Sequence, residues 1–419
     1  MESMRVYFTL HGEKNETLVL MDIKKSSGYR DFMWATEVHR FGLEMLGLWP
    51  KNTTFSIKRF WSQLHAGIIL ILLVFVINVP TIYTVMEDWG DMVLVIGTLR
   101  IALPLLTVTV KYTVMRWKRA VLLSIVNMME EDWVALKSVA ERAVMIRRAR
   151  TARLIMIIGY VFFGSALLIT TVPTYFDVRV VHVTNFTKQT KLPFETYQFY
   201  NIHKSPQLEL TLFLQNITSF LAAATYLTID FFLLLVIFHF CGQLENFRNR
   251  LISLVSCQSF GKILHDIVVY HLRLIKFANH IENTYTLMML IIIFHFVVVF
   301  CFSGFIMTII FKKGEMNKDI VMEICFVIYI LISLLMNTFV YCGAGEMVVE
   351  QSNAVYRAIC DLEWYKLESQ KARNLILLMI RTNHPFHITA GKIIPLTIAT
   401  FCSILKTSCG YISFLLAKR

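Results

Sequence analysis

Long apolar stretches alternate with shorter charged segments along most of the chain. A stretch of about twenty mostly apolar residues is long enough to cross a bilayer as a helix. Seven stretches fit this description, at residues 64–86, 92–112, 154–174, 210–240, 285–311, 320–343 and 392–416. The second is the weakest of them, because Arg100 and Lys111 interrupt it. The pattern predicts an all-α membrane protein with seven transmembrane helices.

The composition agrees with this prediction. Hydrophobic residues make up 56% of the 419 residues and charged residues 17%, whereas soluble proteins carry about 25% charged residues. The net charge of +12 would suggest nucleic-acid binding in a soluble chain. In a membrane protein such a charge is explained by the Lys and Arg residues of the cytoplasmic loops, so we expect no nucleic acid partner. The first sixty residues contain no apolar run of signal-peptide length, and no cleaved signal is expected.

The distribution of Lys and Arg between the segments predicts the orientation. The N-terminal segment and the 2–3, 4–5 and 6–7 connections together hold 28 of them, and the remaining connections and the C-terminal tail hold 9. Positively charged segments stay in the cytoplasm. We therefore expect a cytoplasmic N-terminus and an extracellular C-terminus. None of the eight cysteines then lies in an external loop, so no external disulfide framework is expected.

This orientation is the reverse of that of a G-protein-coupled receptor. The Asp-Arg-Tyr and Asn-Pro-x-x-Tyr signatures of such receptors are also absent after the third span and in the seventh. The sequon at Asn185 lies in a segment predicted to be extracellular and is a candidate glycosylation site, whereas those at Asn15 and Asn52 would be cytosolic.

Catalytic patterns are weak. His384 and His387 lie three residues apart, but the proline between them and the lack of acidic partners argue against a metal site. No phosphate-binding glycine loop or nucleophile elbow is present. We expect neither an enzyme nor a bound cofactor or metal.

Charged residues inside a membrane span are costly and are functional candidates. Arg100, Asp230 and Glu323 fall within the second, fourth and sixth spans. Arg100 and Glu323 both lie in outer halves, so one interpretation is a pair across the bundle. The alternative places Glu323 at the membrane interface and Arg100 in a water-filled crevice.

The 4–5 and 6–7 segments show helical spacing of apolar residues, which predicts that the spans continue into the cytosol as packed helices. The residues that carry this pattern are Leu251, Leu254, Val255, Ile263, Leu264, Ile267, Val268, Val355, Ile359, Leu362, Leu375, Leu378 and Met379. Such a helical platform either holds subunits together or forms a bundle within one chain.

The C-terminal region, residues 359–416, resembles the signature of insect odorant receptors. The matching motifs are Glu363-Trp364-Tyr365, Gln370-Lys371, Leu375–Arg381, Thr389-Ala390-Gly391-Lys392 and Lys406-Thr407-Ser408-Cys409-Gly410-Tyr411. Cys409 and Gly410 replace the family's usual Tyr-Ser. The 4–5 segment, 241–284, is too short for the insertion of the family's shared co-receptor, so the chain resembles a ligand-tuned subunit.

The resemblance implies an odorant-gated, nonselective cation channel in which tuned subunits and co-receptor form a heterotetramer. It implies a multi-pass protein of the plasma membrane of olfactory neuron dendrites. The expected regions are a cytoplasmic segment (1–63), six spans with the ligand pocket (64–343), a cytosolic anchor segment with Trp364 and Tyr365 in the assembly surface (344–391), and a pore-lining seventh helix with a short tail (392–419). A metabotropic seven-helix receptor is the alternative, and a secondary transporter is disfavoured by the odd number of spans.

Helical spacing of 100° per residue places a polar face on the seventh span. This face comprises Thr397, Thr400, Ser403, Thr407, Ser408 and Tyr411, and Phe414 and Leu415 continue it outward. Thr407, Tyr411, Phe414 and Leu415 are the pore and gate candidates, and Lys406 should point away from them. The alternative for this face is a helix-packing seam of small hydroxyl residues.

A ligand pocket is expected among the outer halves of the second, third, fourth and sixth spans. Its candidate lining residues are Val95, Phe162, Phe163, Phe213, Asn216, Phe220, Phe326 and Tyr329. They are mostly aromatic and only Asn216 and Tyr329 offer hydrogen bonds, which suits an apolar volatile or hydrocarbon-like ligand. Each of them could equally be an ordinary core residue.

Overall fold

The protein is almost entirely helical. The computed structural model describes residues 27–50, 56–135, 138–184, 196–197, 199, 206–254, 260–313 and 318–417. Residues 27–45 form the first described helix. The long helices that follow are α2 (Ser56–Ile71), α3 (Val79–Glu87), α4 (Met92–Trp117), α5 (Arg119–Val134), α6 (Val139–Thr184), α7 (Gln207–Ile252), α8 (Phe260–Lys313), α9 (Lys318–Cys360), α10 (Ser369–Thr382) and α11 (Ile398–Ala417).

Short irregular helices connect some of these elements. A π-helical stretch, Leu72–Asn78, joins α2 to α3 directly before Pro80, whose missing N–H interrupts α-helical hydrogen bonding. A 3₁₀ turn, Asp88–Gly90, leads to α4, and the carboxylate of Asp91 caps α4 by accepting hydrogen bonds from the N–H groups of Val93 (2.9 Å) and Leu94 (3.4 Å). A second 3₁₀ turn, Trp364–Lys366, precedes α10.

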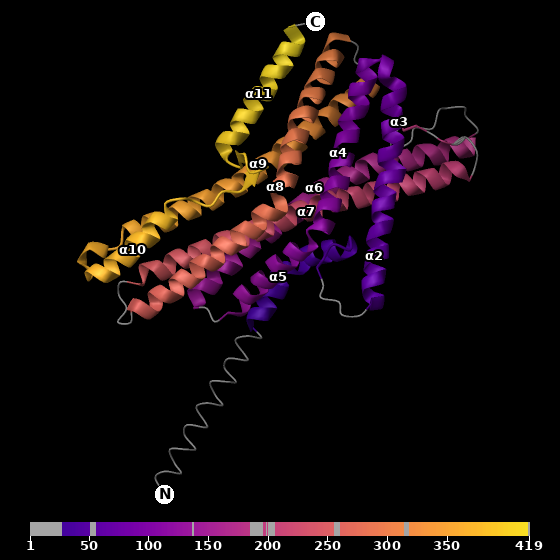
Figure 1. Cartoon of the computed structure of the whole chain (residues 1–419). Helices are drawn as coiled ribbons and strands as arrows, with labels where there is room; N and C mark the ends of the chain where they lie inside the picture. The colour runs from indigo at the N-terminus through magenta and orange to yellow at the C-terminus, as the bar shows by residue number, and fades with distance from the viewer. Residues whose placement is uncertain are drawn as a thin grey trace.

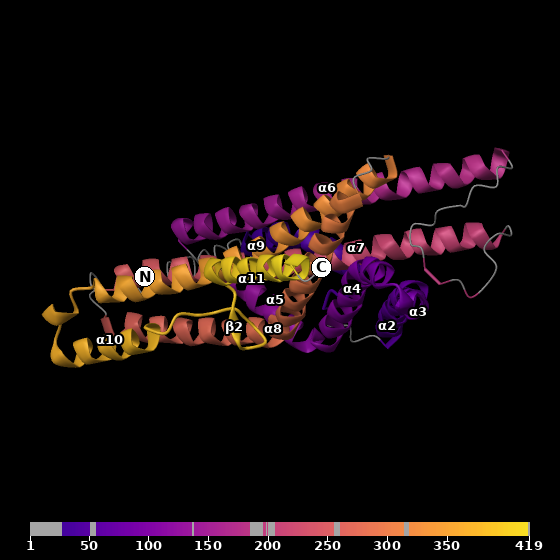
Figure 2. The same cartoon turned by 90° about the horizontal axis from the view of Figure 1, so that it is seen from above.

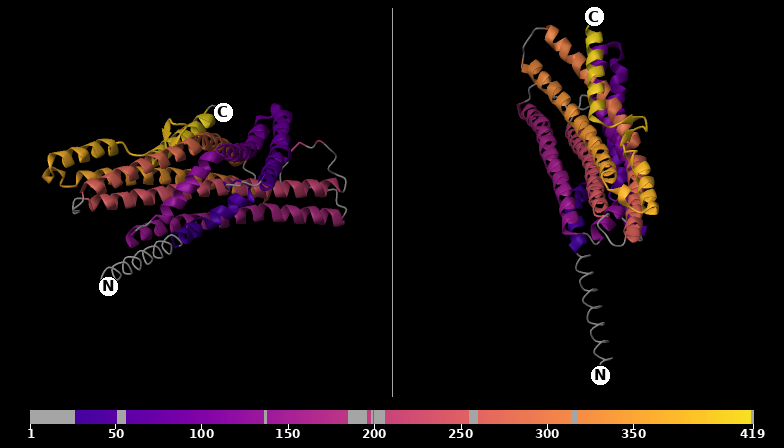
Figure 3. Two further views of the ribbon diagram at one scale, coloured as in Figure 1. Left: turned by 60° about the horizontal axis from the view of Figure 1, so that its bottom comes forward. Right: turned by 90° about the vertical axis from the view of Figure 1, so that its left-hand side faces the viewer.

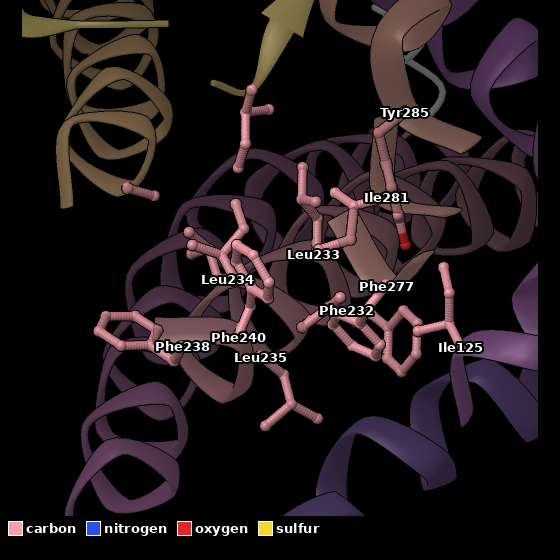
Figure 4. Close-up of a cluster of buried hydrophobic side chains, with 14 of the residues drawn as sticks. Ile125, Phe232, Leu233, Leu234, Leu235, Phe238, Phe240, Phe277, Ile281 and Tyr285 are labelled. Atoms are coloured by element: carbon pink, nitrogen blue, oxygen red, sulfur yellow. The ribbon is translucent and has the colours of Figure 1, made fainter. Parts of the chain in front are cut away.

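The centre of the fold is α7. All residues from 227 to 244 are buried, so this part of the helix is covered on every side. It packs against α4, α6, α8 and α9, and α6 runs beside it (Figure 2). Figure 4 shows its buried side chains Phe232, Leu233 and Phe240 next to Phe277 and Ile281 of α8. A helix that is apolar all round is one that the rest of the protein encloses.

Helix 27–45 completes this cover. A Cβ atom on Gly42 would lie 2.9 Å from the side chain of Thr228, so the backbone of this helix lies directly against Thr228 of α7. Phe32 and Leu43 of the same helix belong to the buried core.

Five helical stretches in the described part of the chain are long and apolar enough to cross a membrane. They are Phe60–Gly90, Met92–Trp117, Gln207–Ile252, Phe260–Lys312 and Ile320–Lys366. They contain the predicted spans one, two, four, five and six. The third predicted span lies within α6 and the seventh overlaps α11. The seventh is helical only from Ile398, later than the predicted start at residue 392.

The predicted helical extensions are confirmed. α7 and α8 both continue through the 4–5 segment, where Phe247 stacks on His271 with 5.3 Å between ring centroids. Leu251, Leu254, Leu264 and Ile267 are buried, whereas Val268 is exposed and Val255 lies outside the described residues. In the 6–7 segment five of the six predicted residues are buried, namely Val355, Ile359, Leu362, Leu375 and Leu378.

A small hairpin connects α10 to α11. β1 (Thr389–Ala390) and β2 (Ile394–Pro395) pair antiparallel, with Thr389 opposite Pro395 and Ala390 opposite Ile394. Gly391 and Lys392 form the turn with φ angles of 65° and 61°, in the left-handed region that glycine favours. From this hairpin α11 runs to the end of the molecule opposite helix 27–45 (Figures 1 and 3).

Candidate pore helix and ligand-binding region

Glu282 and Thr286 of α8 hold the hairpin at the base of α11. The carboxylate of Glu282 accepts a hydrogen bond from the N–H of Thr389 (3.1 Å) and a second from its hydroxyl. Thr286 accepts two more, its carbonyl from the N–H of Gly391 (2.9 Å) and its hydroxyl from the N–H of Lys392 (3.0 Å). The left-handed turn is therefore fixed against one face of α8.

α9 holds the first turn of α11. The carboxylate of Glu346 accepts a hydrogen bond from the N–H of Ile398 at 3.1 Å. This N–H is one of the four that a helix start leaves without an intrahelical partner, and an anion there also interacts favourably with the helix dipole. The neighbouring Gly345 lets the chain approach, since a Cβ atom there would lie 2.1 Å from the carbonyl oxygen of Leu396. The position of α11 is thus set by both α8 and α9.

α11 has one packed side and one exposed side. On the packed side Ser408 is 0% exposed, and Ile412 fits against Gly304 of α8, where a Cβ atom would lie 2.4 Å from Ile412. On the other side Ser403, Thr407 and Tyr411 are exposed. The single polar face predicted from the sequence is therefore divided, because Ser408 turns toward α8. Lys406 is also exposed rather than buried against its own chain.

Two gate candidates cannot be placed. The side chains of Phe414 and Leu415 lie outside the described residues, although their backbone belongs to α11. The candidate glycosylation site Asn185 is also outside the described residues.

Aromatic residues from α6 and α9 meet in the region expected for the ligand pocket. Phe162 stacks on Tyr329 with 5.6 Å between ring centroids and meets Phe163 edge to face at 5.3 Å. Val95 of α4 is buried, and Asn216 of α7 is partly buried.

Four of the pocket candidates are exposed on the single chain, and Phe162 is one of them at 41%. Phe213 and Phe220 of α7 are 61% and 51% exposed on the single chain, and Phe326 is also exposed. Two cavities in the described part of the chain, of about 230 and 610 Å³, are lined by none of the eight candidates. The pocket therefore remains a prediction from the sequence.

Arg100 and Glu323 lie close together, as the first of the two interpretations, a pair across the bundle, predicts. The Arg100 Nη2 atom lies 3.8 Å from the Glu323 Oε1 atom, and the guanidinium carbon lies 5.5 Å from the ring centroid of Phe326. Arg100 is 5% exposed, and within the described residues its Nε and Nη1 atoms have no hydrogen-bond partner. This ion pair joins α4 to α9 beside the ring of Phe326.

A second ion pair lies at the centre of the bundle. The Lys111 Nζ atom of α4 contacts both carboxylate oxygens of Asp230 of α7, at 2.7 and 2.8 Å, and both side chains are buried. The ammonium also lies 3.7 Å from the ring centroid of Tyr226, whose hydroxyl accepts a hydrogen bond from Asn337 of α9. The sequence showed both charges inside predicted spans but gave no sign that they pair.

The two aromatic residues predicted in an assembly surface differ in exposure. Trp364 is half-buried and packs against the hydrophobic core, whereas Tyr365 is 67% exposed on the single chain. Their rings meet edge to face at 6.1 Å.

Comparisons with known proteins identify the family. A family model described as "7tm Odorant receptor" matches residues 91–409, which is most of the chain. Curated relatives include odorant receptor 85b of Drosophila melanogaster, 24% identical over 49% of this chain, and odorant receptor 10 of Aedes albopictus, 22% identical over 51%. The chain belongs to the insect odorant receptor family. This family is one of receptors rather than enzymes, and the long apolar helices agree with a membrane protein.

The fold of this odorant receptor has been seen in solved structures. It is similar to the insect olfactory receptor OR5 from Machilis hrabei, with a TM-score of 0.79 and 13% identity. It is also similar to the complex of that receptor with eugenol, with a TM-score of 0.78 and 12% identity. Both matches cover 93% of this chain and 100% of the other. The alignments to the two named relatives span 51% and 56% of those proteins' lengths.

Proposed function

We propose that this odorant receptor is the ligand-tuned subunit of a ligand-gated, nonselective cation channel that it forms with a shared co-receptor as a heterotetramer. The observation that carries the proposal is the two-sided character of α11. One side packs on its own chain, and the other presents Ser403, Lys406 and Thr407. Polar side chains are not stable against lipid, so this side faces water or a neighbouring subunit.

The short connection between α7 and α8 favours a tuned subunit over a co-receptor. α7 ends at Ile252 and α8 begins at Phe260, which leaves no room for a long insertion. The proposed location is the plasma membrane of olfactory neuron dendrites, with the N-terminus in the cytoplasm and the C-terminus outside.

The proposed ligand is an apolar volatile or hydrocarbon-like molecule. The contact of Phe162 with Tyr329 supports a binding region between α6 and α9, because stacked aromatic rings suit an apolar ligand and the Tyr329 hydroxyl can orient it. Replacing Phe162 by Ala should weaken the response to the ligands of this receptor without reducing its surface expression.

Cysteine labelling tests the pore assignment. In a background with the exposed native residues Cys325, Cys360, Cys402 and Cys409 replaced by Ser, cysteines at positions 407 and 411 should react with an external charged thiol reagent and alter the ligand-evoked current. A cysteine at the buried position 408 should react at least about tenfold more slowly, since thiol reactivity requires access. Similar rates at all three positions would contradict a water-filled pore beside the exposed side.

Current recording tests the channel itself. With the co-receptor co-expressed and G-protein signalling blocked, ligand should still evoke current within milliseconds. A response that disappears with the G protein would favour the metabotropic alternative. Leu415→Ser should raise the ligand-free current if a ring of apolar side chains closes the pore by dewetting.

Assembly with the co-receptor has its own test. Trp364→Ala should reduce co-purification with the co-receptor. Tyr365→Ala should reduce it as well, because the Tyr365 ring is more exposed than that of Trp364 and offers a partner more surface. Unchanged co-purification of both variants would show that the assembly surface lies elsewhere.

A further inference from the structure

A cavity of about 230 Å³ lies where α7, α8, α9 and α10 meet the segment that leads to the hairpin. It is remote from the residues expected to bind odorant, and it contains the histidine pair His384 and His387. Hydrogen bonds of Ser352 hold one of its walls. The Ser352 hydroxyl accepts a hydrogen bond from the N–H of Phe386 (3.3 Å) and donates one to the carbonyl of Val348 (2.8 Å).

The two ends of the cavity have different chemistry. The inner end is apolar, with Leu244, Phe247 and Val355 all buried. The buried His271 ring stacks on Phe247 and also meets the ring of Phe386 at 6.3 Å. An aromatic or aliphatic group fits such a surface.

The outer end offers hydrogen-bond donors and positive charge. Arg381, His384 and His387 line it, and all three are exposed. No aspartate or glutamate is among the residues that line the cavity. In the described part of the chain no carboxylate forms an ion pair with Arg381. By contrast, Arg147 and Arg148 of α6, Arg250 of α7 and Arg273 of α8 each have an acidic partner.

We propose that this cavity is a binding site for a small organic anion, a molecule with an apolar or aromatic body and one phosphate or carboxylate group. The planar guanidinium of Arg381 matches either group with two parallel hydrogen bonds, and imidazole N–H groups add donors beside it. The body of the ligand would lie against Phe247 and Val355. The cavity is lined in part by α10 and by the segment that leads to α11. Its occupant would therefore contact the segment that positions the proposed pore helix.

The first test uses phenyl phosphate as the probe and the purified full-length receptor with its co-receptor. Phenyl phosphate should bind and raise the Tm by about 2 to 5 °C at saturation. Phenol, which lacks the charge, and inorganic phosphate, which lacks the ring, should each bind at least about tenfold more weakly. Equal binding of phenol and phenyl phosphate would overturn the proposal, because the site would then be simply apolar.

Variants locate the site. Arg381→Gln should weaken phenyl phosphate binding at least about tenfold, and His387→Gln should weaken it as well. Arg373→Gln is the matched control, because Arg373 lies on the same helix, is exposed and does not line the cavity. If Arg381→Gln fails to fold, His387→Gln alone decides. Binding that survives both changes, or that Arg373→Gln reduces equally, would contradict the proposal.

Two further arms identify the source of the ligand. Stabilisation by phosphatidylinositol 4-phosphate in nanodiscs, lost in Arg381→Gln, would assign the site to a lipid headgroup. Stabilisation by phenyl phosphate with no response to that lipid would assign it to a soluble anion. Stabilisation by Zn²⁺ without any response to phenyl phosphate would show that the histidines bind a metal, and would overturn the proposal.

Discussion

The middle of α7 and the whole of α11 are both apolar helices, but they differ in what covers them. Between residues 227 and 244, α7 is enclosed on all sides by its own chain. α11 packs against its own chain on one side, which includes Ser408 and Ile412, and leaves Thr407 exposed on the other. The packing of this part of α7 is complete in one chain, whereas α11 leaves one side for the water or neighbouring subunit of the proposed channel.

The charged residues of the two helices also differ in burial and in pairing. Asp230 of α7 is buried and has Lys111 as its partner at 2.7 Å. Lys406 of α11 is exposed, and within the described residues no carboxylate pairs with it. A buried charge has to be paired within the chain, while an exposed one can be satisfied by solvent or by a neighbour.

The largest expected effect is on the enclosed part of α7. Asp230→Ala leaves the ammonium of Lys111 buried without its partner, which should cost about 3 to 5 kcal/mol of stability. We expect loss of surface expression and of a monodisperse peak in size-exclusion chromatography. The control is the double variant Lys111→Met/Asp230→Leu, which removes both charges and should recover most of the expression. If the double variant also loses its expression, the polar contacts with Tyr226 matter more than the charge balance.

A smaller effect is expected from His39, which lies on the helix that covers α7. Its ring is 1% exposed, and neither ring nitrogen has a hydrogen-bond partner within the described residues. Burial, with a smaller contribution from Arg153, lowers the pKa of His39 from 6.5 to about 3. Protonation therefore favours the unfolded chain, and the stability from neutral His39 is complete above pH 6.5 and falls as the pH decreases toward 3.

The corresponding measurement is thermal unfolding of the purified receptor between pH 7 and pH 5. The contribution of His39 to the free energy of unfolding should decrease by about 2 kcal/mol over this range, since each unit below 6.5 costs about 1.4 kcal/mol. His39→Leu should remove this part of the pH dependence while the carboxylates contribute equally to both proteins. Identical pH profiles for the two proteins would contradict the burial of His39.

The sequence predicted the helices of both regions better than their contacts. Apolar length located the spans, and helical spacing located the extensions of α7 and α8, because these depend on local pattern alone. The C-terminal motifs pointed to the family. Helical spacing could not tell which side of α11 meets α8, so Ser408 was placed on the wrong side.

Most contacts between distant residues were beyond the sequence, although the pairing of Arg100 with Glu323 was one of its two interpretations. Lys111 and Asp230 both stood out as charges within spans, but the alignment of α4 with α7 depends on packing over the whole bundle. The hairpin before α11 was missed, although Gly391 and Pro395 are residues that commonly mark a turn and a helix boundary. The apolar composition of residues 393–398 led to a predicted span that starts at residue 392, in spite of Gly391 and Pro395.

An intermediate effect is expected where the two regions are joined. Glu346 of α9 caps α11, so Glu346→Ala should cost about 1 kcal/mol, as the loss of a helix cap does. Glu346→Gln, which keeps an acceptor oxygen, should cost less. Surface expression of both should stay near wild type, and the concentration of ligand needed for half-maximal current should shift more in Glu346→Ala. Equal responses of the two variants would show that the cap does not help to position α11.

The smallest expected effect distinguishes the two sides of α11 directly. The Ser408 hydroxyl is buried and has no hydrogen-bond partner within the described residues, so Ser408→Ala should change stability by less than about 0.5 kcal/mol and leave ion permeability unchanged. Thr407 is exposed, and its hydroxyl donates to the Ser403 carbonyl at 2.9 Å. Thr407→Val keeps the shape of the side chain but replaces a hydroxyl that water can reach with a methyl group. We expect it to alter the relative permeability to cations, measured from reversal potentials. A change in permeability for Ser408→Ala and none for Thr407→Val would mean that α11 is rotated in the assembled channel, with Ser408 toward the pore.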